Sequence, residues 1–319
     1  MPRNGRVVGI DISKAKADAC IRSLQLRLAQ PSTPQGQAEM VAWLRANEVA
    51  SAVMEASGGY ERGWAEAIRE AGIAVRIVDP KRVRYFAKSA GRLAKNDPID
   101  AAMIAWFAET FAIAVEQTCD RDRDTLDRLM TARRLLVRVA SQIGQLGEHR
   151  QPPAVVDAER AIGTAIAAQL ATLEAAIATA IEANAAFAAR QAIIQSVPGL
   201  GVRFAAGALA WLPELGSIGN KAAAALVGIA PYDDDSGARR GERHIKGGRR
   251  EIRDLLYLAT LTATRCNPII KAHYQRLRAT GKKAKVALVA CMRKQIVILN
   301  TMLARDQMWN PPAGAVALA

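Results

Sequence analysis

Cysteine, histidine and aromatic residues are scarce in this sequence. Its cysteines are Cys20, Cys119, Cys266 and Cys291, which are far apart and form no CxxC pair. The sequence therefore encodes neither a disulfide framework nor a thiolate zinc site, and a reducing cytosol fits it. The three histidines are too dispersed for a zinc site and too few to assign a catalytic triad. Because a GxSxG motif is also absent, a serine protease or esterase is not expected.

Basic residues outnumber acidic residues in this sequence. The 319 residues include 44 Lys and Arg against 30 Asp and Glu, a formal net charge of +14. Such an excess favours a polyanionic partner, nucleic acid ahead of a membrane surface. The N-terminus, MPRNGRVVGIDI, does not resemble a signal peptide, and charges or prolines interrupt the later apolar runs. We therefore expect a cytoplasmic protein with no membrane partner.

The first third of the chain alternates short β-branched runs with helical patterns. Extended runs are predicted at RVVGIDI, ADACIRS and LQLRLA, followed by a helix over about residues 34–47. SAVMEA and IAVRIVD are then strand-like, and each precedes a helix. The predicted order βββαβαβα describes a mixed sheet flanked by helices, an α/β domain over residues 1–117 that an apolar helix at 99–115 closes.

The segment 118–192 is helical by pattern, with a break at Pro152 and Pro153. In its second half the spacing of apolar residues alternates between three and four and defines one stripe: Ile162, Ile166, Leu170, Leu173, Ile177 and Ile181. This pattern predicts a long helical coiled-coil hairpin that joins copies of the chain into a homo-oligomer, a dimer or tetramer. A helical bundle within one chain is the alternative.

Residues 193–308 are predicted to form a mainly α C-terminal domain, with a flexible tail at 309–319. The domain begins with VPGLGVRFAAGAL, which has the pattern of a helix-hairpin-helix. Gly199 and Gly201 would there let backbone N–H groups approach a phosphate at a helix N-terminus. A turn that serves packing alone is the alternative.

Four carboxylates are candidates for a metal site. Asp11 lies in an apolar strand, and Glu55 ends another. Ligands of α/β sheets bind outside the carboxyl ends of parallel strands, which is where these two residues are expected. Asp97 and Asp100 are three residues apart at a helix start, which sets both on one helical face. Carboxylate oxygens suit Mg²⁺ or Mn²⁺, and such ions assist phosphodiester displacement. Taken singly, each residue also has an ordinary interpretation as a cap, a salt bridge or a solvated charge.

Ser236 lies beside the densest basic stretch of the chain. Cations there would neutralise a phosphate and its pentacovalent transition state. The predicted nucleic-acid-binding residues of this stretch are Arg239, Arg240, Arg243, Lys246, Arg249, Arg250 and Arg253. A turn serine in a basic binding loop is the alternative interpretation.

Three groups of motifs together resemble one known family. They are VVGIDISKAKADA, the run from AVMEASGGY to KNDPIDA, and SVPGLG with LVGIAPYDDDSGARRGERHIKGGRREIRDLLYLA. As a set, these motifs are similar to those of the DEDD-type insertion-sequence transposases. The resemblance covers about residues 6–306, although the middle matches only in its helical character.

The resemblance implies a RuvC-like, ribonuclease-H-like N-terminal domain and a C-terminal domain with a catalytic serine. The family's acidic positions map onto Asp11, Glu55, Asp97 and Asp100, and its serine maps onto Ser236. It implies that Ser236 attacks a DNA phosphodiester to form a covalent protein–DNA intermediate, while the acids hold Mg²⁺. It also implies a structured noncoding RNA, called a bridge or seek RNA, that pairs with donor and target DNA.

The leading hypothesis is therefore a DNA transposase or recombinase that excises and inserts an insertion sequence. Its acids and its serine would act on the same phosphate, within one chain or from opposite chains. A metal-dependent junction resolvase, which would need the acids but not Ser236, is one alternative. A non-enzymatic nucleic-acid-binding scaffold is the other.

Overall fold

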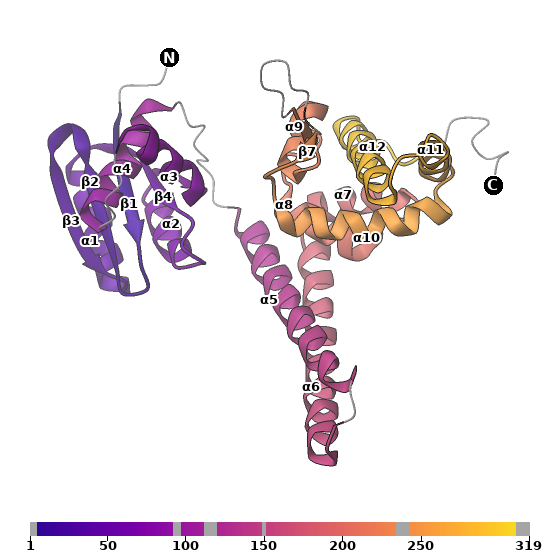
Figure 1. The fold of residues 1–319 in the computed structure, drawn as a ribbon. Helices are drawn as coiled ribbons and strands as arrows, with labels where there is room; N and C mark the ends of the chain where they lie inside the picture. The colour runs from indigo at the N-terminus through magenta and orange to yellow at the C-terminus, as the bar shows by residue number, and fades with distance from the viewer. Residues whose placement is uncertain are drawn as a thin grey trace. The chain divides into compact units, whose positions relative to one another are not determined.

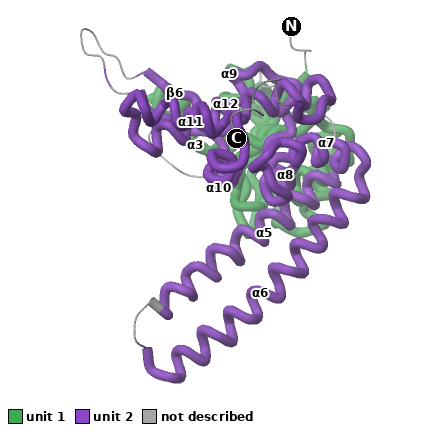
Figure 2. The backbone as a smooth tube through the Cα atoms, turned by 90° about the vertical axis from the view of Figure 1, so that its right-hand side faces the viewer, with its two compact units in different colours: residues 1–120 green, residues 121–319 purple. Residues whose placement is uncertain are grey.

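The computed structural model describes residues 5–91, 97–111, 120–148, 151–233, 241 and 243–310, with residues 97–99 and 148 described by backbone alone. The chain divides into two compact units, residues 1–120 and 121–319 (Figure 2). Each unit is described by itself.

Unit 1 is an α/β domain, as predicted. Its elements are β1 (Arg6–Ile12), β2 (Lys16–Ile21), η1 (Arg22–Leu24), β3 (Leu26–Pro31), α1 (Pro34–Ala46), β4 (Val49–Glu55), α2 (Glu61–Glu70), β5 (Ala74–Val78), α3 (Pro80–Ser89) and α4 (Asp97–Thr110) (Figure 1). Within the described residues, the strands form one five-stranded sheet in the order β3-β2-β1-β4-β5. Only β2 runs against the others, because β1 pairs with β2 antiparallel, β2 with β3 antiparallel, and β1 with β4 and β4 with β5 parallel.

Helices cover both faces of this sheet. On one face, alternate residues of β1 such as Val8 and Ile10 pack in a core with Leu44 of α1 and Trp64 of α2. On the other face, Val53 of β4 packs with apolar residues of α4. Both cores follow from the period of two in strand side chains. The polar residues of the same strands therefore divide between two chemically different faces.

Gly9 sets how closely α4 approaches the sheet. A Cβ atom at Gly9 would lie 2.3 Å from both the Ala101 oxygen and the Ala105 nitrogen, so the α4 backbone rests directly on β1. No side chain fits in that space. Glycine at this position allows the first turns of α4 to lie over the second half of β1.

Unit 2 is helical apart from one short hairpin. It contains α5 (Arg121–Gly144), η2 (Gln145–Glu148), α6 (Pro153–Glu182), α7 (Ala185–Ser196), α8 (Val202–Trp211), α9 (Asn220–Val227), β6 (Pro231–Tyr232), β7 (His244–Ile245), α10 (Arg250–Cys266), α11 (Pro268–Ala279) and α12 (Ala284–Ala304). Its main core joins residues of α7, α8, α9, α10 and α12.

The α5–α6 hairpin is docked on this core at one end. The Trp211 Nε1 atom donates to Asp127 at 2.7 Å, and Arg134 of α5 pairs with Glu251 of α10 at 2.5 Å. Leu126 and Met130 are buried there with residues of α6 and α8. α5 and α6 run side by side away from the core (Figure 2).

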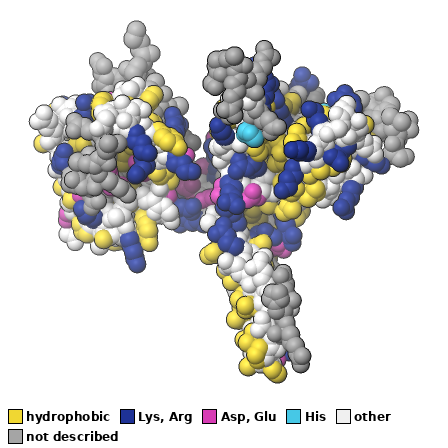
Figure 3. Space-filling model, in the orientation of Figure 1, with side chains coloured by type: hydrophobic (Ala, Val, Ile, Leu, Met, Phe, Trp, Pro, Cys, Tyr) yellow, Lys and Arg dark blue, Asp and Glu magenta, His cyan; other side chains and the backbone are white. Residues whose placement is uncertain are grey.

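The far part of the hairpin exposes apolar side chains to solvent (Figure 3). The exposed ones are Leu146, Val156 and Ile162. Leu135 and Val137, which follow the docked Arg134 along α5, are exposed as well. Of the predicted stripe, Ile166, Ile177 and Ile181 are buried, whereas Ile162 is 44% exposed. The stripe is thus covered within the chain at its docked end and open at its far end.

Two of the described helices, α6 and α12, are long and apolar enough to cross a membrane by length and composition alone. More than half of the apolar window of α12 is buried in the unit 2 core, as in many core helices, whereas 11% of the α6 window is buried.

Candidate functional sites

Asp11 and Glu55 lie on one face of the sheet, at adjacent strand ends. β1 and β4 are parallel neighbours in which Gly9 pairs with Val53 and Ile10 with Met54. Asp11 and Glu55 each follow two residues after the Gly9–Val53 pair, so both project from the face that α4 covers. The carboxyl ends of parallel strands are where α/β sheets bind ligands.

The direction of α4 brings Asp100 to the same end of the sheet. Ala101 lies against Gly9, whereas Glu109, near the other end of α4, accepts a hydrogen bond from Arg22 at 2.6 Å. Arg22 directly follows β2 and so lies at the opposite end of the sheet from Asp11. The first turn of α4, with Asp97 and Asp100, is therefore over the strand ends that carry Asp11 and Glu55.

A further carboxylate, Asp18, stands beside Asp11. The two residues are register partners on the antiparallel strands β1 and β2, so their side chains share a face. Lys16, two residues before Asp18, pairs with it at 2.9 Å. Sequence analysis missed this residue, although the alternation in KADACI, with Ala17, Ala19 and Ile21 buried in the opposite core, would have placed it there.

These carboxylates fit a hard divalent cation by donor type, because carboxylate oxygens are the ligands that Mg²⁺ prefers. Among the described residues, however, no three acidic, histidine or cysteine side chains are arranged to hold an ion. The Asp97 side chain lies outside that description. The structure thus brings Asp11, Glu55 and Asp100 to one end of the sheet face that α4 covers, but the described side chains are not arranged as the ligands of one ion.

Ser236, Arg239 and Arg240 lie outside the described residues, but the chain on either side of them is fixed. Tyr232 of β6 pairs with His244 of β7, and Asp233 forms an ion pair with Arg243 at 2.5 Å. These two contacts hold the ends of the segment together.

Two backbone segments that flank the β6–β7 hairpin cross closely at Gly228 and Gly248. A Cβ atom at Gly248 would lie 2.2 Å from the Gly228 nitrogen, and both glycines have positive φ values, of 70° and 75°. The Arg253 guanidinium donates to the carbonyl groups of Gly228 and Gly247, at 3.3 and 2.6 Å. Any phosphate that reached Arg253 would have to compete with these hydrogen bonds.

Arg249 is also engaged within the protein. Its guanidinium donates to both carboxylate oxygens of Glu214, at 2.6 and 2.5 Å, and to the Trp211 carbonyl at 2.8 Å. Burial alone would raise the pKa of Glu214, but the hydrogen bonds and charge of Arg249 outweigh it and hold that pKa below its usual value. The remaining described cations of the basic stretch are more open: Lys246 is exposed, and Arg250 forms an exposed pair with Asp254 at 3.5 Å.

The VPGLG turn is fixed by packing at its first glycine. A Cβ atom at Gly199, where φ is +95°, would lie within 2.8 Å of the Ala263 backbone on α10. Packing thus accounts for glycine at this position. Gly201 is exposed and precedes the first turn of α8, with open space around its Cα atom. It is the glycine of this turn that a ligand could reach.

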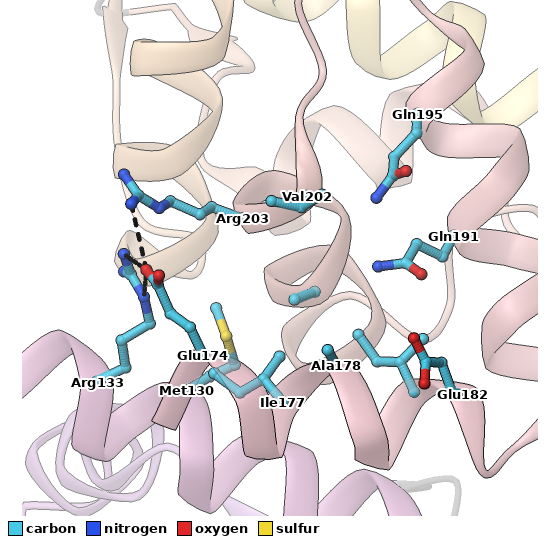
Figure 4. Close-up of a pocket in the computed structure, with 12 residues that line it drawn as sticks. Met130, Arg133, Glu174, Ile177, Ala178, Glu182, Gln191, Gln195, Val202 and Arg203 are labelled. Carbon is cyan, nitrogen blue, oxygen red and sulfur yellow. Dashed lines mark hydrogen bonds and ion pairs between the residues drawn. The ribbon is translucent and has the colours of Figure 1, made fainter. Parts of the chain in front are cut away.

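A cavity of about 460 Å³ lies where α5, α6, α7 and α8 meet (Figure 4). Glu174 of α6 accepts hydrogen bonds from Arg133 Nε and Nη2, at 3.0 and 2.8 Å, and pairs with Arg203 at 3.2 Å. The Arg133 hydrogen bonds are the main reason that the pKa of Glu174 is lowered. These contacts fix one wall of the cavity, and sequence analysis did not foresee it.

Two family profiles match the chain. One, described as "Transposase" and of the DEDD type, matches residues 8–146, which include Asp11, Glu55, Asp97 and Asp100. The other, described as "Transposase IS116/IS110/IS902 family", matches residues 191–275, which include Ser236. The two halves of the sequence resemblance are thus found independently.

Individual proteins agree with these profiles. The uncharacterized 43.6 kDa protein of insertion element IS110 from Streptomyces coelicolor is 32% identical over 142 residues, 44% of this chain and 34% of that protein. The uncharacterized 42 kDa protein of IS900 from Mycobacterium paratuberculosis is 36% identical over 137 residues, about a third of its length. The pilin gene-inverting protein of Moraxella lacunata is 22% identical over 94% of this chain and 96% of its own.

The two profiles, matched at residues 8–146 and 191–275, both describe transposases. Within that class, the chain belongs to the family of DEDD-type insertion-sequence transposases to which the IS110 element gives its name. This confirms the family predicted from the sequence.

Proposed function

We propose that this chain is the transposase of an insertion sequence, which it excises and inserts by DNA strand cleavage and rejoining. The observation that carries the proposal is the gathering of Asp11, Glu55 and the first turn of α4 at one end of one sheet face. Full-length similarity to the pilin gene-inverting protein supports recombination, and matches to two insertion-element proteins support transposition.

We assign unit 1 a RuvC-like, ribonuclease-H-like role. The strand order β3-β2-β1-β4-β5, with only β2 reversed and α4 across β1, supports this assignment. Asp11, Glu55, Asp97 and Asp100 would hold Mg²⁺ or Mn²⁺, which when bound would polarise the scissile phosphate. Asp18 would add negative charge beside Asp11, and Lys16 would balance part of it.

Ser236 is the proposed nucleophile. Its Oγ atom would form a bond to the phosphorus of a DNA phosphodiester, while the bond from phosphorus to the leaving sugar oxygen breaks. The serine proton would pass to a base, and the leaving strand would end in a hydroxyl group. Attack of a hydroxyl of another strand on the phosphoserine would reverse these changes and join the strands. The neighbouring cations, led by Arg239, Arg240 and Arg243, would stabilise the negative charge on the phosphoryl oxygens.

The proposed partners are the DNA of the element ends and of the target, with a structured noncoding RNA as the guide. The net charge of +14 is compatible with both nucleic acids. The chain would act in the bacterial cytoplasm, on the nucleoid, as a homo-oligomer.

Trapping a covalent intermediate tests this function. The chain, DNA carrying the flanks of its gene and RNA transcribed from those flanks would be incubated with Mg²⁺ and denatured. We expect a DNA adduct on the tryptic peptide that contains Ser236, and its loss in Ser236→Ala. If the DNA is cleaved without forming an adduct, and Ser236→Ala cleaves it as well, the mechanism is instead that of a metal-dependent resolvase. Binding without cleavage in any arm would favour a scaffold.

A further inference from the structure

The helices at the end of unit 2 carry a concentrated positive charge that the transposase motifs leave unassigned. Residues 255–305 contain ten Lys and Arg but no Asp or Glu. The basic stretch around Ser236 differs, because described cations there pair with Asp233, Glu214 or Asp254. The charge of residues 255–305 thus has no acidic counterpart within the segment, and Lys and Arg side chains are spread over these helices (Figure 3).

Part of this charge lines a pocket of about 430 Å³ between α11 and α12. Lys271, His273 and Arg276 come from α11, and Lys294 comes from α12. The described residues that line the pocket include no Asp, Glu, Phe, Tyr or Trp. Its chemistry is therefore mainly that of an anion site, and the imidazole of His273 is the one aromatic ring among the described lining residues.

The two walls of the pocket are held together by buried contacts. Ile270, next to Lys271, packs against Cys291, one turn before Lys294, in a core that includes Ala263. The start of α11 is fixed as well, since Asn267 caps Ile269 and Ile270 and donates to the Pro198 carbonyl at 3.3 Å. The cations thus stand on two rigid helices and not on a loop.

The cations of the pocket lie close to His273. Burial lowers the pKa of His273, and the charges of Lys294 and Arg276 lower it further. The Arg276 guanidinium contacts His273 Nδ1 at 3.2 Å. Lys271 and Lys294 are half-buried, so their charges are less screened than those of fully exposed lysines.

We propose that the α11–α12 pocket is a docking site for the phosphodiester backbone of a nucleic acid, separate from the serine segment. The inference rests on the proposed function only in taking a nucleic acid as the partner. Three cations around one pocket suit one or two adjacent phosphates, and the lack of Phe, Tyr and Trp among the described lining residues favours contact with the backbone over stacking on bases. Duplex DNA and folded RNA both offer this chemistry.

The test compares two full-length variants with the same loss of charge. The pocket variant is Lys271→Gln, Arg276→Gln and Lys294→Gln. The matched control is Lys282→Gln, Lys283→Gln and Lys285→Gln, which removes three exposed cations of the same acid-free segment outside the pocket. Binding of a labelled 30-base-pair DNA duplex and of an RNA hairpin would be measured by anisotropy at several salt concentrations.

We expect the pocket variant to bind at least one of the two nucleic acids about tenfold more weakly near physiological salt. The slope of log affinity against log salt should fall by about 1–2 units, near 0.9 for each phosphate that the variant no longer neutralises. The control should change both quantities much less. Loss confined to the duplex would identify DNA as the source of the phosphate, and loss confined to the hairpin would identify RNA.

Equal losses of nucleic-acid affinity in the two variants would overturn the proposal. They would show that the positive charge of the whole segment attracts nucleic acid and that the pocket is not a distinct site. Unchanged binding by the pocket variant would overturn it while leaving the transposase function intact. Failure of the wild type to bind either probe would contradict both. A pocket variant that loses affinity for poly-glutamate but not for nucleic acid would show a site for acidic protein instead. The single change Arg276→Gln, at an exposed position, gives the same comparison should the triple variant fold poorly.

Discussion

Asp11 and Asp18 face each other across the antiparallel pair β1 and β2, on the side of the sheet that α4 covers. Like charges directly opposite in a ladder destabilise it unless a cation intervenes. Lys16 supplies one such cation through its 2.9 Å pair with Asp18. The Asp18–Lys16 pair therefore adds carboxylate oxygens beside Asp11 without adding net charge, and carboxylate oxygens are the ligands that divalent cations such as Mg²⁺ prefer.

Removing one candidate metal ligand should abolish catalysis without unfolding the protein. We expect Asp11→Asn, Glu55→Gln, Asp97→Asn and Asp100→Asn each to reduce strand cleavage by about 100-fold or more, because each deletes an anionic ligand and opens no cavity. Mg²⁺ should raise the Tm of the wild type but not of these variants. Glu39→Gln, an exposed change on α1 across the sheet, is the control. Cleavage by Asp11→Asn in EDTA at the wild-type rate would end the metal hypothesis.

The cations nearest Ser236 should dominate the salt dependence of DNA binding at that segment. Replacing Arg239, Arg240 and Arg243 together by Ala should lower the slope of log affinity against log salt by up to about 3 units. Titrations of a DNA duplex at several salt concentrations measure this slope. An unchanged slope would place these residues away from the DNA backbone.

Arg249→Ala should instead act on stability. It removes the bidentate pair with Glu214 and the hydrogen bond to Trp211, which predicts a loss of about 1–2 kcal/mol for this half-exposed pair. The salt slope of DNA binding should change little. Urea unfolding measures the loss, and Arg250→Ala, at an exposed pair, is the matched control.

The same pair should contribute to acid sensitivity. Because the pKa of Glu214 is lower in the folded state than its usual value, the pair stabilises the protein above about pH 4.5. This stabilisation should be lost as the pH falls through the folded-state pKa. Unfolding free energies measured from pH 6 downwards should therefore converge between wild type and Arg249→Ala, and parallel curves would contradict the assignment.

The open end of the α5–α6 hairpin should mediate self-association. Leu146→Lys with Ile162→Lys should shift the chain towards monomer, since both side chains are apolar and exposed at that end. Leu258→Lys with Val286→Lys, at exposed apolar positions of α10 and α12, should not. Sedimentation measures the mass. A wild-type monomer independent of concentration, with or without nucleic acid, would contradict this prediction.

Thiol reactivity should separate the cysteines by burial. Burial raises the pKa of Cys291 to about 11 and also raises that of Cys20, whereas Cys266 is exposed. At pH 8 only about one Cys291 in a thousand would be thiolate. Iodoacetamide should thus modify Cys266 well before Cys20 or Cys291, as read by peptide mass spectrometry. Equal labelling in the native protein would mean that the α11–α12 seam opens.

Local patterns predicted the α/β unit well because its strands are short, β-branched and bounded by turns. The order of strands along the chain and the placement of Asp11 and Glu55 near strand ends follow from these runs and their boundaries. Asp18 was missed as a neighbour of Asp11 because the register between β1 and β2 cannot be predicted from the composition of the two strands. Helical spacing singled out Asp97 with Asp100, and the basic stretch drew attention to Ser236, whereas the resemblance to a family gave Ser236 the role of a nucleophile.

The helical unit was harder to foresee because its packing is made by distant residues. The apolar stripe correctly indicated a long helix at 153–182, but not that Ile177 and Ile181 are buried against α5 and α8. The dense basic stretch did not indicate that Arg249 pairs with Glu214 or that Arg253 donates hydrogen bonds to backbone carbonyl groups. The Glu214 and Gly228 partners are 35 and 25 residues away along the chain.

The pairing of β6 with β7, backed by the close crossing of Gly228 and Gly248, means that the rest of unit 2 fixes both ends of residues 233–243. Once the ends of a segment are fixed, its conformational entropy depends only weakly on its length, by roughly 0.6 kcal/mol for each doubling. The segment that carries Ser236 can therefore gain or lose residues during evolution with little effect on the stability of the unit. Under the proposed function, the sequence around Ser236 and the stability of unit 2 could therefore change separately.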